Sequence, residues 1–197
     1  MTTTLLETRE LVEKRKAFLF DFDGTLANLD KLNVDSFQIL LKQEFDLDFT
    51  REEFMKYVSG RGSKDGLRMY LMNENVKSFD VEELSKKFNQ IKRELLDSNL
   101  EEEVYIIDGL PNFLQYLKEN NKRMVVVTSS NFDYVKTVLE HFGLFVYFEK
   151  VYDRGTVDKG KPNPEMFLQA VEYTELPNEE CIAFEDSLFG LRSAQSA

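Results

Sequence analysis

Short apolar runs alternate with longer amphipathic segments along this chain. Four of the runs are rich in aromatic or β-branched residues and too short to bury a helix, so they predict strands: Ala17–Phe20, Met124–Val127, Glu149–Tyr152 and Cys181–Phe184. The second run is apolar at every position. Such continuity is typical of a central parallel strand that helices cover on both faces.

Segments with apolar residues every three or four positions predict helices. Four of them lie between the first two strands, at residues 32–45, 50–58, 64–73 and 81–99. Thr50 and Asp80, each followed three residues later by a glutamate, have the form of capping boxes and place two helix starts. Three further helices are expected at residues 112–120, 134–142 and 165–173.

The order of these elements predicts an α/β protein with a doubly wound parallel sheet, interrupted after its first strand by a four-helix bundle. We expect a core formed by residues 1–30 and 104–197 and a helical insert formed by residues 31–103. Ahead of the first strand, residues 7–16 form either a loosely docked polar helix or a partly disordered terminus. The first fifteen residues lack the apolar core of a signal peptide.

Composition narrows the possible functions. The chain has 197 residues, 42% of them hydrophobic, and no apolar run long enough to span a membrane. Its net charge of -11 argues against nucleic acid or an anionic membrane as a partner. The single cysteine, Cys181, and the single histidine, His141, make a zinc cluster or a serine-histidine hydrolase improbable. We therefore expect a globular cytoplasmic protein, monomeric or weakly self-associating.

Two aspartates follow the first predicted strand directly. Asp21 and Asp23 precede Gly24 and Thr25 at the carboxyl end of this strand, the edge at which open α/β sheets bind ligands. A plain Asp-Gly turn is the alternative interpretation. Glu185 and Asp186 follow the last predicted strand in the same way, so two pairs of acids lie at strand ends.

Hydroxyl groups and a restrained lysine mark two other strand ends. Thr128 follows the second strand, and free backbone amides after it would suit an anion. Capping of the next helix explains Ser129 and Asn131 about equally well. Lys161 lies between Gly160 and a pair of prolines, on a stiff loop before a helix.

These four segments together resemble the haloacid dehalogenase superfamily of phosphohydrolases. Asp-Phe-Asp-Gly-Thr from Asp21, Thr128, Gly-Lys-Pro-Asn-Pro around Lys161, and the acid pair at Glu185 follow the order of its four motifs. The resemblance implies that the helical insert is a cap that closes over the active site. The family usually continues with a further strand and helix beyond the point where this sequence ends, at Ala197, so an edge strand is expected to be missing.

The resemblance also implies roles for these residues. Asp21 would attack phosphorus to form an aspartyl-phosphate, and Asp23 would act as general acid and base. Thr128 and Lys161 would bind the transferring phosphoryl group. The expected substrate is a small phosphomonoester, with sugar phosphates as the expected class.

A magnesium ion follows from the charges. Asp21, Asp23, Glu185 and Asp186 would converge on one crevice, where each like-charged pair about 5 Å apart costs about 3 kcal/mol at an effective dielectric near 20. A hard divalent cation with oxygen ligands offsets that repulsion, and Mg²⁺ is the expected one.

In the insert, Arg61 and Lys64 belong to a basic, glycine-rich loop that could reach an anionic substrate. A solvated loop and helix start is the alternative interpretation of both residues.

Two other functions compete with a phosphatase. A phosphomutase of the β-phosphoglucomutase type must grip a second phosphate, but the corresponding positions here are Ser63, Asn131 and Phe132, and its hinge histidine corresponds to Asn33. An inactive binding or regulatory module is the other alternative. Such a module would be expected to have lost Asp21, Asp23 or Lys161, and this sequence retains all three.

Overall fold

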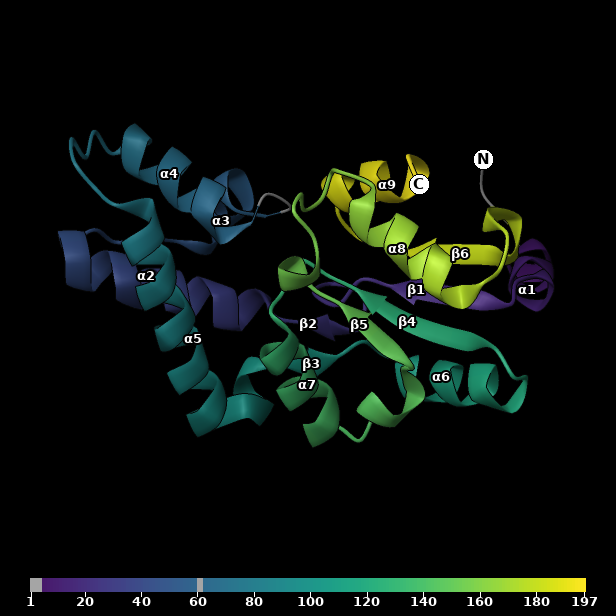
Figure 1. Cartoon of the computed structure of the whole chain (residues 1–197). Helices are drawn as coiled ribbons and strands as arrows, with labels where there is room; N and C mark the ends of the chain where they lie inside the picture. The colour runs from purple at the N-terminus through teal and green to yellow at the C-terminus, as the bar shows by residue number, and fades with distance from the viewer. Residues whose placement is uncertain (1–4, 60–61) are drawn as a thin grey trace. The chain divides into compact units, whose positions relative to one another are not determined.

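The structure of the chain is a computed structural model that describes residues 5–59 and 62–197. It divides into two compact units, one formed by residues up to Leu26 together with Ile106–Ala197, and the other by Ala27–Tyr105 (Figure 1). Within the described residues, no helix has both the length and the apolar character needed to cross a membrane.

A four-stranded parallel sheet forms the centre of the larger unit. Its strands are β1 (Ala17–Phe20), β4 (Arg123–Val127), β5 (Lys150–Tyr152) and β6 (Cys181–Phe184), in the order β5-β4-β1-β6. The register pairs Ala17 with Arg123 on one side and with Cys181 on the other. The four strands predicted from the apolar runs are therefore present, and they share one direction.

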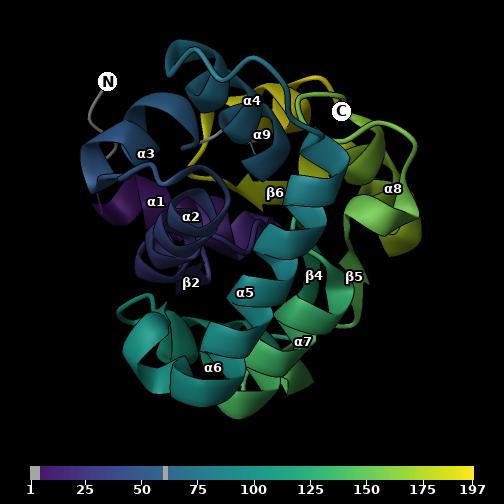
Figure 2. The same cartoon turned by 90° about the vertical axis from the view of Figure 1, so that its left-hand side faces the viewer.

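Helices cover both faces of this sheet (Figures 1 and 2). On one face lie α6 (Leu110–Glu119) and α7 (Phe132–His141), and on the other α8 (Glu165–Thr174) and α9 (Leu188–Gln195). The helix α1 (Leu5–Lys14) precedes β1. Short 3₁₀ helices lie in the connections of this unit: η1 (Phe145–Tyr147), η2 (Arg154–Thr156) and η3 (Asn178–Glu180). This is the doubly wound arrangement that the sequence predicts.

Alternation along β1 gives each face its own core. Phe18 and Phe20 pack with Phe113 of α6 and with Phe184 of β6, the Phe20–Phe184 ring centroids lying 5.0 Å apart. Leu19 faces the other way and joins a cluster that includes Phe167 of α8. Because all four residues of β1 are buried, this strand is the centre around which both layers pack.

The smaller unit contains the four predicted helices, α2 (Asp30–Phe45), α3 (Arg51–Tyr57), α4 (Ser63–Asn73) and α5 (Val81–Glu103). Thr50 and Glu53 form the predicted capping box of α3, and Asp80 caps α5 by accepting from the N–H groups of Glu82 and Glu83. The last predicted helix ends at Asn99 as expected, because the backbone of Asn99 is non-helical; a second, short helical segment follows this kink up to Glu103.

Several helix boundaries differ from the sequence prediction by one or two residues, and two short strands were not predicted. The helix α7 begins at Phe132 rather than Tyr134, because the side chain of Asn131 caps it by accepting from the N–H of Asp133. Two short strands, β2 (Ala27–Asn28) and β3 (Tyr105–Ile106), pair with each other where the chain passes between the units. They have two residues each, too few to produce a periodic pattern.

Phe37 is expected to be essential to the smaller unit. Its fully buried ring lies 5.2 Å from that of Phe49 and 4.7 Å from that of Phe88. Phe37→Ala should lower the free energy of unfolding by about 3–5 kcal/mol, since it leaves a cavity in this aromatic cluster. Urea denaturation followed by circular dichroism measures the change. Met72→Ala, at a side chain 65% exposed, is the control and should stay within about 0.5 kcal/mol of the wild type.

Candidate active site

The ends of three neighbouring strands meet in the larger unit. Asp21 follows β1, Thr128 follows β4, and Glu185 with Asp186 follows β6. Because the strands are parallel, their carboxyl ends lie at one edge of the sheet, the position at which such sheets bind ligands. Asp21 itself is fixed by its backbone N–H, which donates to the carbonyl of Phe184 at 3.0 Å.

The ammonium group of Lys161 links these strand ends. It donates to Asp21 Oδ1 at 2.7 Å, to the carbonyl oxygen of Val127 at 2.8 Å, and to Glu185 Oε1. The Lys161 side chain is 6% exposed, and those of Asp21 and Glu185 are 10% and 1% exposed. A lysine 140 residues away in sequence is therefore held against Asp21, the first aspartate after β1.

The loop that carries Lys161 is held by its own side chains. Arg154 donates to the carbonyl oxygens of Val157, at 2.7 Å, and Asp158, at 3.1 Å. Glu165, at the start of α8, accepts from the N–H groups of Asp158 and Lys159. The loop is thus closed from both sides, so the backbone that delivers the lysine is fixed.

Three acids form a cluster that could hold a cation. Asp21, Glu185 and Asp186 each offer a carboxylate oxygen, and these oxygens lie within 4.8 Å of one another. Gly24 allows this approach, because a Cβ on it would lie 2.0 Å from Oδ2 of Asp186. Its φ of +83° is also one that side chains other than glycine rarely adopt. The glycine of the first motif therefore makes room for the last acid.

Burial and the repulsion between neighbouring carboxylates raise the pKa of two acids in this cluster. Burial raises the pKa of Asp21 to about 7; Lys161 opposes the rise and Glu185 adds to it. Burial also raises the pKa of Asp186, and the charges of Glu185 and Asp23 raise it further. With three carboxyl groups and one ammonium, the cluster is short of positive charge.

Asp23 lies beside this cluster and is half-buried. Its charge reaches both Asp21 and Asp186, since it raises the pKa of each. It is not one of the three acids whose oxygens lie within the common 4.8 Å, so its expected part in metal binding stays a prediction.

The loop after β4 uses part of its hydrogen-bonding capacity within the protein itself. Thr128 is buried, and its Oγ1 accepts from the N–H of Ser130 at 3.0 Å. Asn131 is committed to capping α7, the alternative that the sequence left open. Ser129, between them, is exposed. Thr128 and Ser129 therefore lie at the strand end, whereas the side chain of Asn131 is directed to its own helix.

Of the two basic residues expected in the insert, the structure describes only Lys64. Arg61 lies outside the described residues. Lys64 belongs to the first turn of α4 in the smaller unit, where its ammonium pairs with Glu82 at 2.5 Å. This exposed ion pair supports the alternative interpretation of Lys64 as a solvated residue at a helix start.

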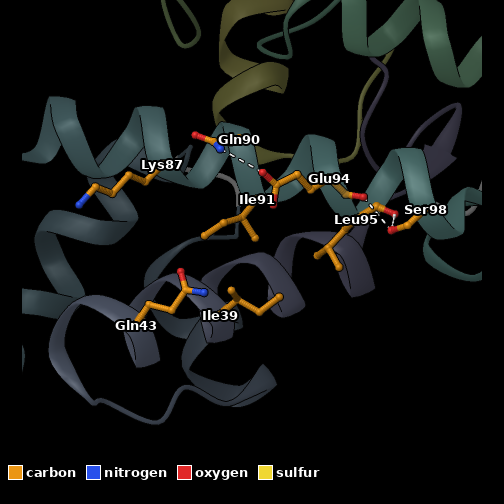
Figure 3. A pocket seen from close by; sticks show the side chains of 8 residues that line it. All are labelled: Ile39, Gln43, Lys87, Gln90, Ile91, Glu94, Leu95 and Ser98. Atoms are coloured by element: carbon orange, nitrogen blue, oxygen red, sulfur yellow. Dashed lines mark hydrogen bonds between the residues drawn. The ribbon is translucent and has the colours of Figure 1, made fainter.

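A separate hollow lies in the smaller unit, between α2 and α5 (Figure 3). Its volume is about 280 Å³, and Ile39, Ile91 and Leu95 form its apolar part. None of the acids, hydroxyls or lysines discussed above lines it, so it carries none of this chemistry.

Residues 18–197 match the model of the haloacid dehalogenase-like hydrolases. The chain belongs to this family. The expected family, enzyme class and α/β fold are therefore confirmed.

Several curated proteins are similar over most of this haloacid dehalogenase-like chain. It is 31% identical to the chloroplastic protein SUPPRESSOR OF QUENCHING 1 of Arabidopsis thaliana, over 93% of this chain but only 17% of that much longer protein. A phosphorylated carbohydrates phosphatase of Thermotoga maritima is 24% identical, and the aligned region covers 92% of this chain and 81% of that protein. The beta-phosphoglucomutase of Bacillus subtilis is 25% identical, with coverage of 92% and 80%.

Among solved structures, CbbY from Rhodobacter sphaeroides in complex with phosphate superposes with a TM-score of 0.78. It covers 92% of this chain and 82% of its own, at 24% identity. This likeness shows the fold.

Sequence reasoning missed the residues that hold Glu185. Its Oε2 accepts from Ser187, from the hydroxyl at 3.2 Å and from the N–H at 3.4 Å, and it lies against Gly190 of α9. The available signal was a glycine five residues after Glu185, in the segment that forms α9. Glycine at such a position often marks a close approach.

Lys161→Met should destabilise the protein strongly. The change leaves two buried carboxylates without their shared ammonium, and breaking a buried ion pair from one side costs about 3–5 kcal/mol. Urea denaturation in the presence of a chelator measures this loss. Lys159→Met, on an exposed lysine of the same loop, should change stability by less than about 0.5 kcal/mol. Equal effects of the two substitutions would contradict a buried pair.

Proposed function

We propose that this protein is a magnesium-dependent phosphatase of small phosphorylated metabolites, with sugar phosphates as the first class of substrate. The observation that carries the proposal is the 2.7 Å contact between Lys161 Nζ and Asp21 Oδ1 at the edge of the sheet. A lysine there can neutralise both the nucleophilic carboxylate and the incoming phosphoryl group. The carbohydrate phosphatase and the beta-phosphoglucomutase among the relatives favour sugar phosphates.

The first step of the proposed reaction uses two carboxyl groups. A carboxylate oxygen of Asp21 attacks phosphorus, the bond to the ester oxygen breaks, and that oxygen leaves with the electron pair. Asp23 donates the proton that neutralises the leaving alcohol. The products of this step are a free alcohol and a phosphorylated Asp21.

The second step restores the enzyme. Asp23, now a carboxylate, takes a proton from water, whose oxygen attacks phosphorus. The bond between phosphorus and the Asp21 oxygen breaks, and inorganic phosphate leaves. In both steps Lys161 neutralises charge on the transferring group, and the Thr128 hydroxyl, which keeps its own proton as a donor, binds a phosphoryl oxygen.

The donor set fits magnesium. Asp21, Glu185 and Asp186 would hold it together with Asp23, because hard carboxylate oxygens are the ligands it prefers and the cluster is short of positive charge. When bound, the ion would supply further positive charge for the phosphoryl oxygens.

The core and the insert expected from the sequence have separate parts in this proposal. Residues 1–30 and 104–197 form the catalytic core, and residues 31–103 form a cap that admits the substrate and shields it from water. Substrate choice would then belong to the cap loops, with Arg61 and Lys64 as the residues to test.

Asp21→Asn should abolish phosphatase activity, because a carboxamide is no nucleophile. Release of inorganic phosphate from sugar phosphates, measured with and without added Mg²⁺, checks this, and a chelator should abolish the wild-type activity. Asp133→Asn, on an exposed acid of α7, is the control and should retain full turnover. Turnover that survives Asp21→Asn or the chelator would contradict the mechanism.

With β-glucose 1-phosphate, the products should be glucose and inorganic phosphate rather than glucose 6-phosphate. A mutase must hold a bisphosphate by both ends, and the matching positions here are Ser63, Asn131 and Phe132, none of which is cationic. A coupled glucose-6-phosphate dehydrogenase assay, with catalytic glucose 1,6-bisphosphate supplied, measures the competing product. Glucose 6-phosphate that accumulates faster than phosphate would establish the mutase instead.

A further inference from the structure

One face of α9 contacts both Glu185 and the loop that carries Lys161. Gly190 and Ser193 are three residues apart on this helix, so they share a face, and both are buried. Gly190 lies under the carboxylate of Glu185. The hydroxyl of Ser193 donates to the carbonyl oxygen of Asn163 at 2.6 Å, in the loop that carries Lys161.

Glu185 occupies the space where a side chain at position 190 would lie. A Cβ built on Gly190 would be 2.0 Å from Cδ and Oε2 of Glu185 and 2.1 Å from its Oε1. Real Cβ atoms do not approach so closely, and the carboxylate is not a free end that can move aside. Lys161 holds one of its oxygens and Ser187 the other.

The same glycine also belongs to the cap of the helix. Its N–H donates to the side chain of Ser187 at 3.0 Å, and Ser187 in turn donates to Glu185. Glu185 therefore rests on the first turn of α9, at the end of the helix that favours negative charge. Gly190 leaves the space and Ser187 supplies the donors.

We propose that Gly190 and Ser193 are positioning residues of the active site. Gly190 sets the place of Glu185, and through it that of the Lys161 ammonium, while Ser193 fixes the loop from which Lys161 extends. Neither residue touches the reacting atoms. The inference rests on the phosphatase proposed above, because it explains how the catalytic lysine is kept in contact with Asp21.

Gly190→Ala tests the proposal, because the expected change in stability is opposite to the change that helix propensity alone would give. In a helix, replacement of glycine by alanine ordinarily stabilises. Here the substitution should lower the urea midpoint of the metal-free protein, because the new methyl group collides with Glu185. In a Glu185→Ala background the space is empty, so the same substitution should raise the midpoint. A Gly190→Ala protein that folds only in that background counts as support. A midpoint that moves the same way in both backgrounds overturns the proposal.

Turnover provides the second readout. At a temperature at which circular dichroism shows each variant folded, Gly190→Ala should lower kcat on the order of 100-fold, the cost of misplacing a catalytic group by about 1 Å. Ser193→Ala should lower kcat less, and Leu191→Ala, on the exposed face of the same helix, should leave it unchanged. A folded Gly190→Ala variant with wild-type kcat overturns the positioning role and leaves the phosphatase intact.

The two proposals can fail separately. If the wild type hydrolyses no phosphomonoester, the proposed function fails. The opposite shifts of the urea midpoint still decide whether Gly190 sets the place of Glu185, because that measurement needs neither metal nor substrate.

Discussion

The buried ammonium of Lys161 is the constraint on which the rest of the site depends. A charge that is 6% exposed is tolerable only when its neighbours replace the water it has lost. Those neighbours come from the ends of β1, β4 and β6, while the lysine comes from the loop after β5. One side chain therefore ties the loop after β5 to the carboxyl ends of the other three strands. The register of the sheet places these strand ends side by side, and the site forms only where they meet.

Much of this arrangement follows from local sequence. The strand at Ala17–Phe20 is apolar and aromatic throughout, and the strand before Thr128 is β-branched, so burial on both faces was predictable. Once both strands are parallel, Asp21 and Thr128 must lie at one edge. The helices of the smaller unit follow just as directly from their apolar spacing and from the caps at Thr50 and Asp80.

What local sequence could not show is which partner each polar side chain takes. Lys64 resembles a substrate-binding lysine until Glu82, eighteen residues away, is seen to pair with it. Asn131 could have faced a ligand, but its carboxamide satisfies an N–H of α7. Glu185 suggests only a metal ligand, yet Lys161 and Ser187 both bind it. Each of these choices depends on distances that arise only when remote segments pack.

The pairing of β2 with β3 has a consequence for how such a chain can fold and change. The two strands bring the entry and exit of the 27–105 unit side by side, although a whole helical bundle separates them in sequence. Once that bundle is folded, the connection from β1 to β4 behaves as a short loop rather than a segment of some hundred residues. The entropy of closing it no longer depends on the length of the insert. An insert joined in this way can grow, shrink or be exchanged while the pairing of β1 with β4 is left undisturbed.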